Sequence, residues 1–198
     1  MQIPDKNRTV KEAKAALRTQ VLARLSALDE EYLRSSDRKI LEQLLALPEF
    51  RCAGRLFLYR SVGWEIDTSA CIELAQALGK TVALPRILGG GIMDFSAMDS
   101  LPEQCFGIPQ PDSKAPALRP QAGDLVLVPG LCYDRNGYRL GRGGGYYDRL
   151  LADCPAYTVG VCRTRFLLES LPREAHDCAV KILITEEKTT RLPEGSPV

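Results

Sequence analysis

The hydrophobic residues near the start of the chain recur at helical spacing. One stripe is formed by Ala13, Leu17, Val21, Leu25 and Leu28. Thr9 and Glu12 have the spacing of a capping box, which predicts that this helix begins after Thr9. A second stripe of leucine and isoleucine predicts a helix from Ser36 to Leu47, with Pro48 as its end.

Short apolar runs between turn residues predict strands in the rest of the chain. We expect strands at 56–59, 81–84, 92–95, 125–128, 157–161 and 180–184. Pro85 is expected to end the second strand, and the strand at 92–95 is expected at an edge. A helix over 68–78, followed by Gly79, separates the first two strands, and this order predicts that they pair in parallel.

The order of the elements predicts the fold class. A helix over 146–152 and a frayed tail after Thr189 complete the expected elements. Alternating strands and helices predict an α/β, Rossmann-like fold, in which a mostly parallel open sheet carries helices on both faces. The length of 198 residues favours a single domain over 1–198. The stretch 86–123 is irregular and rich in proline and glycine, and its pattern fits a flap over a pocket as well as a surface excursion.

Composition and charge narrow the class of function. The net charge of +1 provides no basic field for nucleic acid or a membrane, and no apolar run is long enough to span a bilayer. The polar N-terminus lacks a signal-peptide core. The seven cysteines form no Cys-x-x-Cys pair and His176 is the single histidine, which argues against a disulfide framework, a zinc site or a histidine cluster. We expect a cytoplasmic monomer without a nucleic-acid or membrane partner.

The stretch 124–149 carries the candidate chemistry. Its apolar run 125–128 has the pattern of a strand buried on both faces. Four of the five residues at 141–145 are glycine, so their backbone N–H groups are not shielded by side chains and can approach phosphate closely. Arg139 and Arg142 add charged donors, and the expected helix at Tyr146 adds its N-terminal dipole.

A mobile surface loop is the alternative interpretation of the same glycines. We favour phosphate binding because the glycines are dense, a buried strand precedes them and Asp148 follows them. The familiar nucleotide motifs do not fit. A P-loop requires a lysine after its last glycine, and the dinucleotide fingerprint requires glycine where this chain has Tyr146.

Two further features have both a structural and a functional interpretation. Lys14 and Arg18 are like charges at i, i+4, which are tolerated in water and become favourable with an anion between them. Spacing alone favours a solvated helix face. Glu65 follows an expected strand, at the edge where open α/β sheets bind ligands, but an acidic residue there also favours the start of the next helix.

Two stretches resemble the signature of the 5-formyltetrahydrofolate cyclo-ligase family, whose members are also called methenyltetrahydrofolate synthetases. They are Val-Pro-Gly-Leu-Cys-Tyr-Asp at 128–134 and Gly-Tyr-Arg-Leu-Gly-Arg-Gly-Gly-Gly-Tyr-Tyr-Asp-Arg at 137–149. The resemblance extends, in order along the chain, to Lys14-x-x-Leu17-Arg18, 65–68, 107–111 and His176-Asp177. It therefore covers nearly the whole chain.

The resemblance implies a ligase with ATP as co-substrate and Mg²⁺ as cofactor. Members of the family close the reduced folate 5-formyltetrahydrofolate to 5,10-methenyltetrahydrofolate and release ADP and phosphate. Phosphoryl transfer to the formyl oxygen makes that oxygen a leaving group, and the N10 amine of the same molecule attacks the activated carbon. Because the substrate supplies both nucleophiles, no serine, cysteine or histidine nucleophile is required.

The resemblance also implies roles for individual residues. Asp148 is expected to bind Mg²⁺, and Arg142 and Tyr147 are expected to act in catalysis. The expected substrate-binding residues are Arg60, Glu65, Tyr146 and Tyr147. The expected ATP-binding residues are Lys14, Arg18, Arg139, Leu140, Gly141, Arg142, Gly143, Gly144, Gly145, Tyr146 and Tyr147. These roles replace the solvated-face interpretation of Lys14 and Arg18.

Some positions depart from the family pattern. Some members have lysine where this chain has Gly144, and many have an acidic residue, a second candidate metal ligand, where it has Lys181. Asp177 lies close by but does not match that position. Two alternatives therefore stay open: a folate- or nucleotide-binding relative without turnover, and a different enzyme on a similar sheet, such as a sugar-phosphate isomerase or a CoA transferase.

Overall fold

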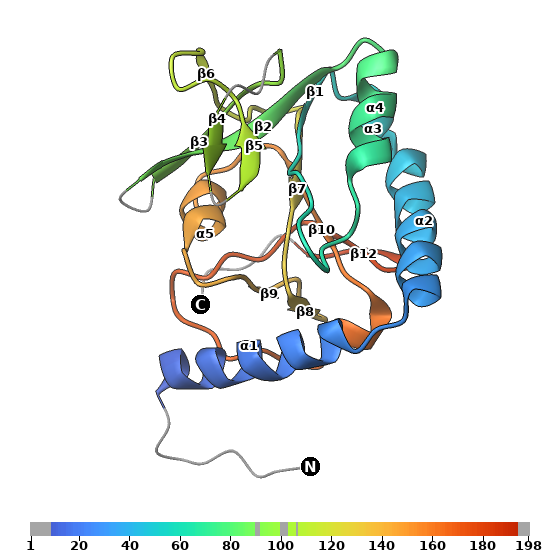
Figure 1. The fold of residues 1–198 in the computed structure, drawn as a ribbon, viewed down its shortest axis with the longest axis vertical. Coiled ribbons are helices and arrows are strands. Elements are labelled where there is room, and N and C mark those ends of the chain that lie inside the picture. Colours follow the sequence, from blue (N-terminus) through green and yellow to red (C-terminus); the bar gives the residue numbers. More distant parts are fainter. Residues whose placement is uncertain (1–8, 90–91, 100–102, 106, 194–198) are drawn as a thin grey trace.

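An eight-stranded sheet forms the centre of the molecule (Figure 1). The computed structural model describes residues 9–89, 92–99, 103–105 and 107–193. Along the sheet the strands lie in the order β13 (Thr189–Arg191), β12 (Ile182–Ile184), β10 (Tyr157–Val161), β7 (Leu125–Val128), β1 (Arg55–Phe57), β2 (Thr81–Gly89), β3 (Ile92–Ala97) and β6 (Ala117–Leu118). The strands from β12 to β2 pair in parallel, whereas β13, β3 and β6 pair antiparallel. The predicted mostly parallel α/β sheet is confirmed.

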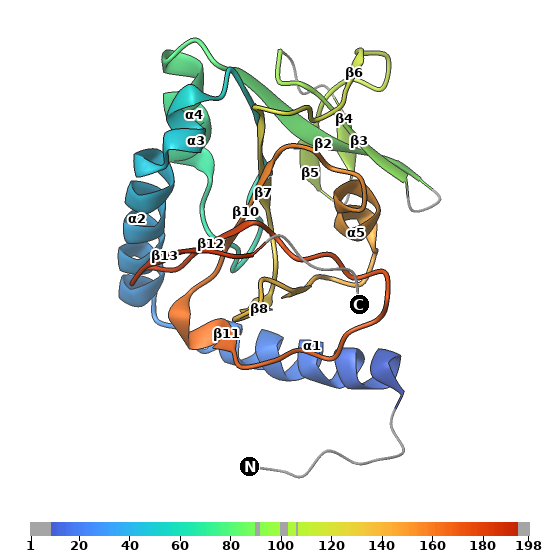
Figure 2. The same ribbon diagram turned by 180° about the vertical axis from the view of Figure 1, so that it is seen from behind.

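Helices cover both faces of this sheet, as predicted. They are α1 (Val10–Ser26), α2 (Glu30–Ala46), α3 (Pro48–Cys52), α4 (Ser69–Ala77) and α5 (Tyr146–Leu151). One core joins α2, α3 and α4 to one face of the strands, and a second core joins α1 and α5 to the other. Figures 1 and 2 show α2 and α4 along one side and α1 across one end. Among the described residues, no helix combines the length and apolar character that crossing a membrane requires.

Two small sheets complete the fold. One pairs β4 (Glu103–Cys105) with β5 (Ile108–Gln110), and the other has the order β11 (Leu167–Leu168), β8 (Cys132–Asp134) and β9 (Arg139–Leu140). A short 3-10 helix at Thr164–Phe166 lies between β10 and β11. The described part of the irregular stretch 86–123 therefore builds strands rather than a long loop.

The starts of the helices follow from capping. Thr9 and Glu12 exchange hydrogen bonds of 2.9 and 3.3 Å between side chain and backbone, so the predicted capping box is confirmed. The second helix begins at Glu30, earlier than predicted, because the carboxylate of Asp29 caps it. The second helix ends at Ala46, one residue before the predicted end at Leu47, so Pro48 marks its end as expected. Pro48 is also the first residue of the separate helix α3, where the missing N–H has no helical partner to lose.

The strand β2 continues past Pro85, which was expected to end it. The N–H of Met98 donates to the carbonyl of Val82 at 2.9 Å, and antiparallel bonding to β3 then falls on alternate residues. The nitrogen of Pro85 therefore faces the β1 side, where pairing ends at Ala83. The missing N–H therefore falls at the end of the ladder with β1 and outside the bonds to β3, so proline is tolerated.

Two edge predictions were wrong. The strand predicted at 92–95 is not an edge strand, because β3 pairs with β2 on one side and β6 on the other. The chain after Thr189 is not frayed over 189–191, because β13 pairs antiparallel with β12, and the part of this prediction that concerns 194–198 lies outside the described residues. The strands at 125–128 and 157–161 have the predicted ends, and β1 and β2 pair in parallel as expected.

A glycine in β10 makes room for a buried tyrosine. Tyr133 in β8 is fully buried, and its hydroxyl donates to the carbonyl of Val128 at 2.7 Å. A Cβ atom on Gly160 would lie 2.5 Å from the ring of Tyr133. This packing fixes β8, and with it the chain that leads to the glycine loop, against the sheet.

We expect Gly160→Ala to lower the free energy of unfolding by about 2 kcal/mol, because overpacking a filled core costs roughly 1–3 kcal/mol. Gly54→Ala is the matched control, since a Cβ atom there would meet no atom within 4 Å. Urea unfolding of the two variants and the wild type measures the difference. Equal effects at both positions would contradict the packing argument.

Candidate active site

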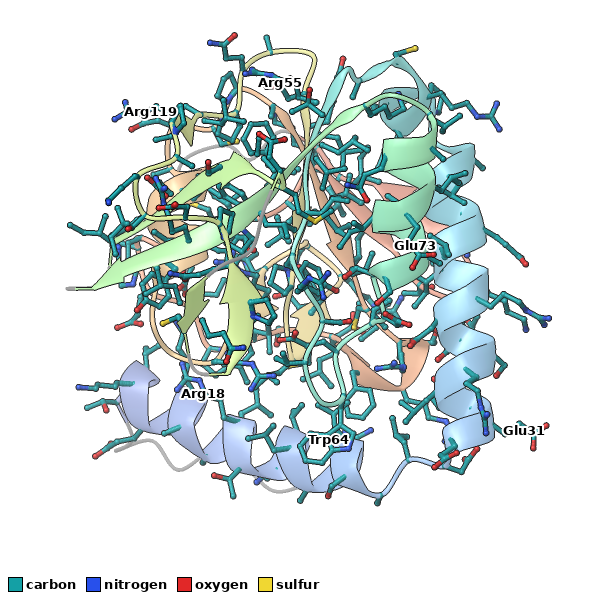
Figure 3. The ribbon with its side chains drawn as sticks, turned by 45° about the horizontal axis from the view of Figure 1, so that its top comes forward. Arg18, Glu31, Arg55, Trp64, Glu73 and Arg119 are labelled. Carbon is teal, nitrogen blue, oxygen red and sulfur yellow. The ribbon has the colours of Figure 1, made fainter. Side chains whose placement is uncertain are left out.

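A candidate site lies where α1 meets the glycine loop at 141–145. The Nε atom of Arg18 donates to the carbonyl of Gly141 at 2.9 Å. A Cβ atom on Gly143 would lie 3.4 Å from the guanidinium carbon of Arg18. Figure 3 shows Arg18 rising from α1 toward the body of the molecule, with Trp64 over the same helix. The structure thus brings together Arg18 and the glycine loop, which the family resemblance separately predicts to bind ATP.

The glycine loop leaves its backbone donors open. Within the described part of the chain, no backbone N–H of 141–145 donates to a protein acceptor. Gly143 and Gly145 have φ angles of 101° and 65°, which residues with a Cβ atom rarely adopt. Successive N–H groups without protein partners are what an anion-binding loop presents to its ligand.

The chain reaches this loop by a route that the sequence did not predict. We expected β7 to lead directly into the loop, but β8 and β9 form an antiparallel pair between them. The helix α5 after the loop is six residues long, so its dipole is small. The loop's own amides, rather than a helix terminus, are the main backbone donors here.

Arg139 and Asp148 form a partly buried ion pair beside the loop. The Nη2 atom of Arg139 lies 2.9 Å from Oδ1 of Asp148, and Nη1 donates to the carbonyl of Cys178 at 3.3 Å. The side chain of Arg139 is 4% exposed and that of Asp148 is 22% exposed. Because a guanidinium already pairs with Oδ1 of Asp148, the expected role of Asp148 as a Mg²⁺ ligand stays a prediction.

Lys14 does not lie on a solvated face. It is 7% exposed, and its Nζ atom lies 2.6 Å from Asp177 and 2.9 Å from Glu174. Burial alone would lower the pKa of Lys14, but the hydrogen bonds to Asp177 and Glu174 outweigh burial and raise it. The same contact with Lys14 lowers the pKa of Glu174. The ammonium of Lys14 is therefore held charged, and it joins α1 to the segment 174–177.

The neighbouring polar residues do not form a second obvious metal site. The ligand atoms of Glu174, His176 and Asp177 lie within 4.8 Å of one another, but Lys14 already places an ammonium against two of them. Lys181 donates to the carbonyl of Ala156 at 3.0 Å. It therefore points to the start of β10 and supplies no metal ligand.

Glu65 and Arg142 pair with each other across the site. The Nε atom of Arg142 lies 3.1 Å from Oε1 of Glu65, and Nη2 donates to the carbonyl of Val62 at 3.4 Å. The other carboxylate oxygen of Glu65 accepts the N–H of Val62 at 2.9 Å. An expected phosphate ligand thus contacts an expected substrate ligand, which places the two predicted half-sites next to each other.

A small open cavity adjoins this pair. Its apolar lining comes from Leu22 and Leu25 of α1 and from Trp64, Ile66, Leu131 and Phe166. Its polar lining includes Glu65, Arg142 and Arg163. The cavity lies beyond the carboxyl ends of β1, β7 and β10, where α/β sheets bind ligands.

The remaining predicted site residues have different surroundings. The hydroxyl of Tyr147 is buried and has no hydrogen-bond partner among the described residues, and burial raises the pKa of Tyr147 far above its ordinary value. A Cβ atom on Gly144 would lie 2.6 Å from the ring of Tyr146. Arg60 is exposed. Leu140 is buried, and its carbonyl accepts the N–H of Leu131, so its expected role in ATP binding stays a prediction.

Sequence reasoning gave no role to several residues that the structure places at the site. Glu174 and Asp177 lie 160 and 163 positions from Lys14, and no local pattern relates them. Trp64 is 42% exposed and lines the cavity. A signal for Trp64 was available, because it is an aromatic residue directly before Glu65 in a loop after a strand.

The fold and the site together define an α/β protein with a glycine-rich loop of open backbone N–H groups beside a cavity of mixed apolar and polar lining. The chain matches the model of the 5-formyltetrahydrofolate cyclo-ligase family over residues 10–186. It belongs to this family, and the resemblance drawn from the sequence is confirmed.

Individual relatives align with this chain over most of their length. The chain is 31% identical to the 5-formyltetrahydrofolate cyclo-ligase of Mus musculus over 196 residues, covering 90% of this chain and 96% of the relative. It is 32% identical to the 5-formyltetrahydrofolate cyclo-ligase of Mycolicibacterium smegmatis over 187 residues, covering 89% and 95%. The NMR structure of Aquifex aeolicus 5,10-methenyltetrahydrofolate synthetase matches with a TM-score of 0.79 and 32% identity, covering 93% of this chain and 95% of that one.

We expect Lys14→Met to lower the free energy of unfolding by about 2 kcal/mol at neutral pH, because it leaves the partly buried Asp177 without its cation. Lys11→Met is the matched control, since Lys11 is exposed on the same helix. Urea unfolding of the two variants measures the difference.

The same comparison predicts a pH dependence. The lowered pKa of Glu174 stabilises the fold above the ordinary value of 4.5, and this contribution is lost as the pH falls through the folded-state value. The gap in stability between wild type and Lys14→Met should therefore be constant near neutrality and narrow below pH 4.5. A gap that widens on acidification would contradict the pairing with carboxylates.

Proposed function

We propose that this chain catalyses the ATP-dependent cyclisation of 5-formyltetrahydrofolate to 5,10-methenyltetrahydrofolate, with release of ADP and phosphate. Membership of the family supports this activity, because the chain covers nearly the full length of relatives that carry its name. The structural observation that carries the proposal is the run of backbone N–H groups at 141–145 without protein acceptors, next to Arg18 and Arg142.

The chemistry requires a leaving group on an unreactive carbon. The formyl group on N5 is an amide, and its oxygen leaves poorly. Transfer of the γ-phosphoryl group from ATP to that oxygen releases ADP and creates a phosphate leaving group. The N10 amine then attacks the formyl carbon within the same molecule, the phosphate departs, and loss of the N10 proton leaves the methenyl bridge. The protein contributes orientation and charge stabilisation.

The nucleotide half of the site consists of Lys14, Arg18 and the stretch 139–147. The open N–H groups of the loop would donate hydrogen bonds to the phosphate oxygens, and the two side chains from α1 would add positive charge. Arg142 would stabilise the charge that develops during phosphoryl transfer. Its contact with Glu65 supports a position between the proposed nucleotide and folate halves.

The folate half consists of the cavity and the residues around Glu65. A carboxylate that is 13% exposed can accept hydrogen bonds from the N–H groups of a reduced pterin. The unpaired buried hydroxyl of Tyr147 offers a polar contact to the reacting substrate, which is the catalytic role that we assign to it. Tyr146 and Arg60 complete the proposed substrate contacts.

Asp148 is the proposed ligand for Mg²⁺, which when bound neutralises charge on the phosphates. Its carboxylate would otherwise repel a polyphosphate in the adjacent loop. We also propose that the whole chain, 1–198, acts as one domain and as a cytoplasmic monomer without nucleic-acid or membrane partners. The net charge of +1 supports the absence of such partners.

A spectrophotometric assay of 5-formyltetrahydrofolate with and without ATP and Mg²⁺ tests the activity. Growth of methenyltetrahydrofolate absorbance that requires both additions is the expected result. Binding of both ligands without product would identify a relative without turnover. A reaction that proceeds equally well without ATP would place the chain with a different class of enzyme.

We expect Asp148→Asn to raise the KM for Mg-ATP about tenfold or more, since a charge-assisted interaction is worth at least ~1.5 kcal/mol. The dissociation constant for 5-formyltetrahydrofolate should stay close to that of the wild type. Asp153→Asn is the matched control, because Asp153 is exposed just after α5. Equal losses for nucleotide and folate would count against the metal role.

We expect Arg142→Ala to raise the KM for ATP about tenfold, because it removes a charged donor from the phosphate loop. Arg135→Ala is the control, since the side chain of Arg135 is 58% exposed in a surface ion pair. Steady-state kinetics with ATP as the varied substrate measure the effect. Unchanged ATP kinetics would remove Arg142 from the phosphate site.

A further inference from the structure

We propose that Arg163, paired with Asp37, is a positioning residue that places the carboxylate of Glu65 at the edge of the cavity. The inference rests on the proposed function, in which Glu65 binds the reduced pterin. It adds to that function the contacts that fix the backbone position of Glu65.

Arg163 is almost fully buried and binds separate parts of the chain. It follows β10 and is 4% exposed. Its Nε atom donates to the hydroxyl of Ser36 at 3.0 Å, and Nη2 donates to the carboxylate of Asp37, both in α2. Its Nη1 atom donates to the carbonyl of Trp64 at 2.7 Å. One guanidinium therefore ties α2 to the residue directly before Glu65.

Asp37 holds the other side of the same loop. One oxygen of its carboxylate pairs with Arg163, and the other accepts the N–H of Asp67 at 3.2 Å. Glu65 thus lies between two peptide groups that are both anchored to α2. Its own N–H donates to the carbonyl of Val62 at 3.3 Å. The backbone from which the side chain of Glu65 projects has little freedom.

The anchored carboxylate faces the site. Oε1 of Glu65 lies 3.1 Å from Arg142, and both Glu65 and Arg163 line the cavity. Binding groups that touch the reacting part of a substrate must be placed accurately, because a misplacement of about 1 Å can cost roughly 100-fold in rate. Loss of the contact to Trp64 would allow such a shift.

Stability alone does not account for this cluster. Replacing a buried ion pair with apolar residues of similar volume is often neutral or stabilising. The segment 60–67 forms no helix or strand, so it depends on contacts of this kind for a defined position. A positioning role therefore explains why a guanidinium, with donors in several directions, lies here.

Arg163→Lys tests the proposal with the charge retained. A lysine ammonium keeps the pairing with Asp37 but cannot also reach Ser36 and the carbonyl of Trp64 in the same planar geometry. We expect the KM for 5-formyltetrahydrofolate to rise about tenfold, with the KM for ATP within about twofold of wild type. Arg34→Lys, at an arginine side chain that is 78% exposed, is the matched control. Equal changes in the KM values for the two substrates would overturn the positioning role.

A double variant separates this role from the proposed function. If Arg163 acts through Glu65, then Glu65→Gln with Arg163→Lys should show the same folate KM as Glu65→Gln alone. Additive losses would contradict the proposal. An unchanged folate KM in Glu65→Gln would refute the proposed role of Glu65 and this inference with it. A strong effect of Glu65→Gln beside a neutral Arg163→Lys would refute the positioning role alone.

Tryptophan fluorescence gives a readout that does not need turnover. Trp64 is the single tryptophan of the chain, and it is 42% exposed. We expect acrylamide to quench Trp64 more strongly in ligand-free Arg163→Lys than in the wild type or in Arg34→Lys, because the loop has lost its anchor. Unchanged quenching would show that the loop keeps its place without Arg163, and the proposal would fall.

Discussion

The hydrogen bond from Arg18 to the carbonyl of Gly141 is the contact on which the rest of the site depends. It joins the first helix to a loop 123 positions later, and it engages an acceptor of the loop while the loop's N–H groups stay open. The same helix contributes Leu22 and Leu25 to the cavity wall. The position of α1 therefore affects both the glycine loop, through Arg18, and the wall of the neighbouring cavity. The two half-sites then meet where Arg142 contacts Glu65.

Local signals were sufficient for most of the elements. The apolar run at 125–128 is continuous because this central strand is buried on both faces. Gly79 has a φ angle of 70°, as a residue that follows a helix often does. Pro85 was misjudged because its effect depends on whether a neighbouring strand needs its N–H. That information lies in the sheet order, which a single segment does not contain.

The residues of the site also differ in how far local sequence could predict them. The glycine loop could be recognised because its chemistry is concentrated in consecutive residues. The environment of Lys14 could not, because Glu174 and Asp177 approach it only in the folded chain. Helical spacing shows which side of α1 carries Lys14 but not what lies opposite, so a solvated face was the natural interpretation from spacing alone. The anchoring of Trp64 by Arg163 was hidden for the same reason, since the two residues come from separate segments.

The ion pair between Lys14 and Asp177 has a consequence for synthesis on the ribosome. Translation produces the lysine early and the aspartate 163 positions later. A nascent chain therefore cannot complete this part of the molecule until Asp177 has left the exit tunnel. Products that end before Asp177 would contain the glycine loop but lack the carboxylate that pairs with Lys14 of the first helix. The proposed nucleotide half of the site is therefore complete only once Asp177 has been translated.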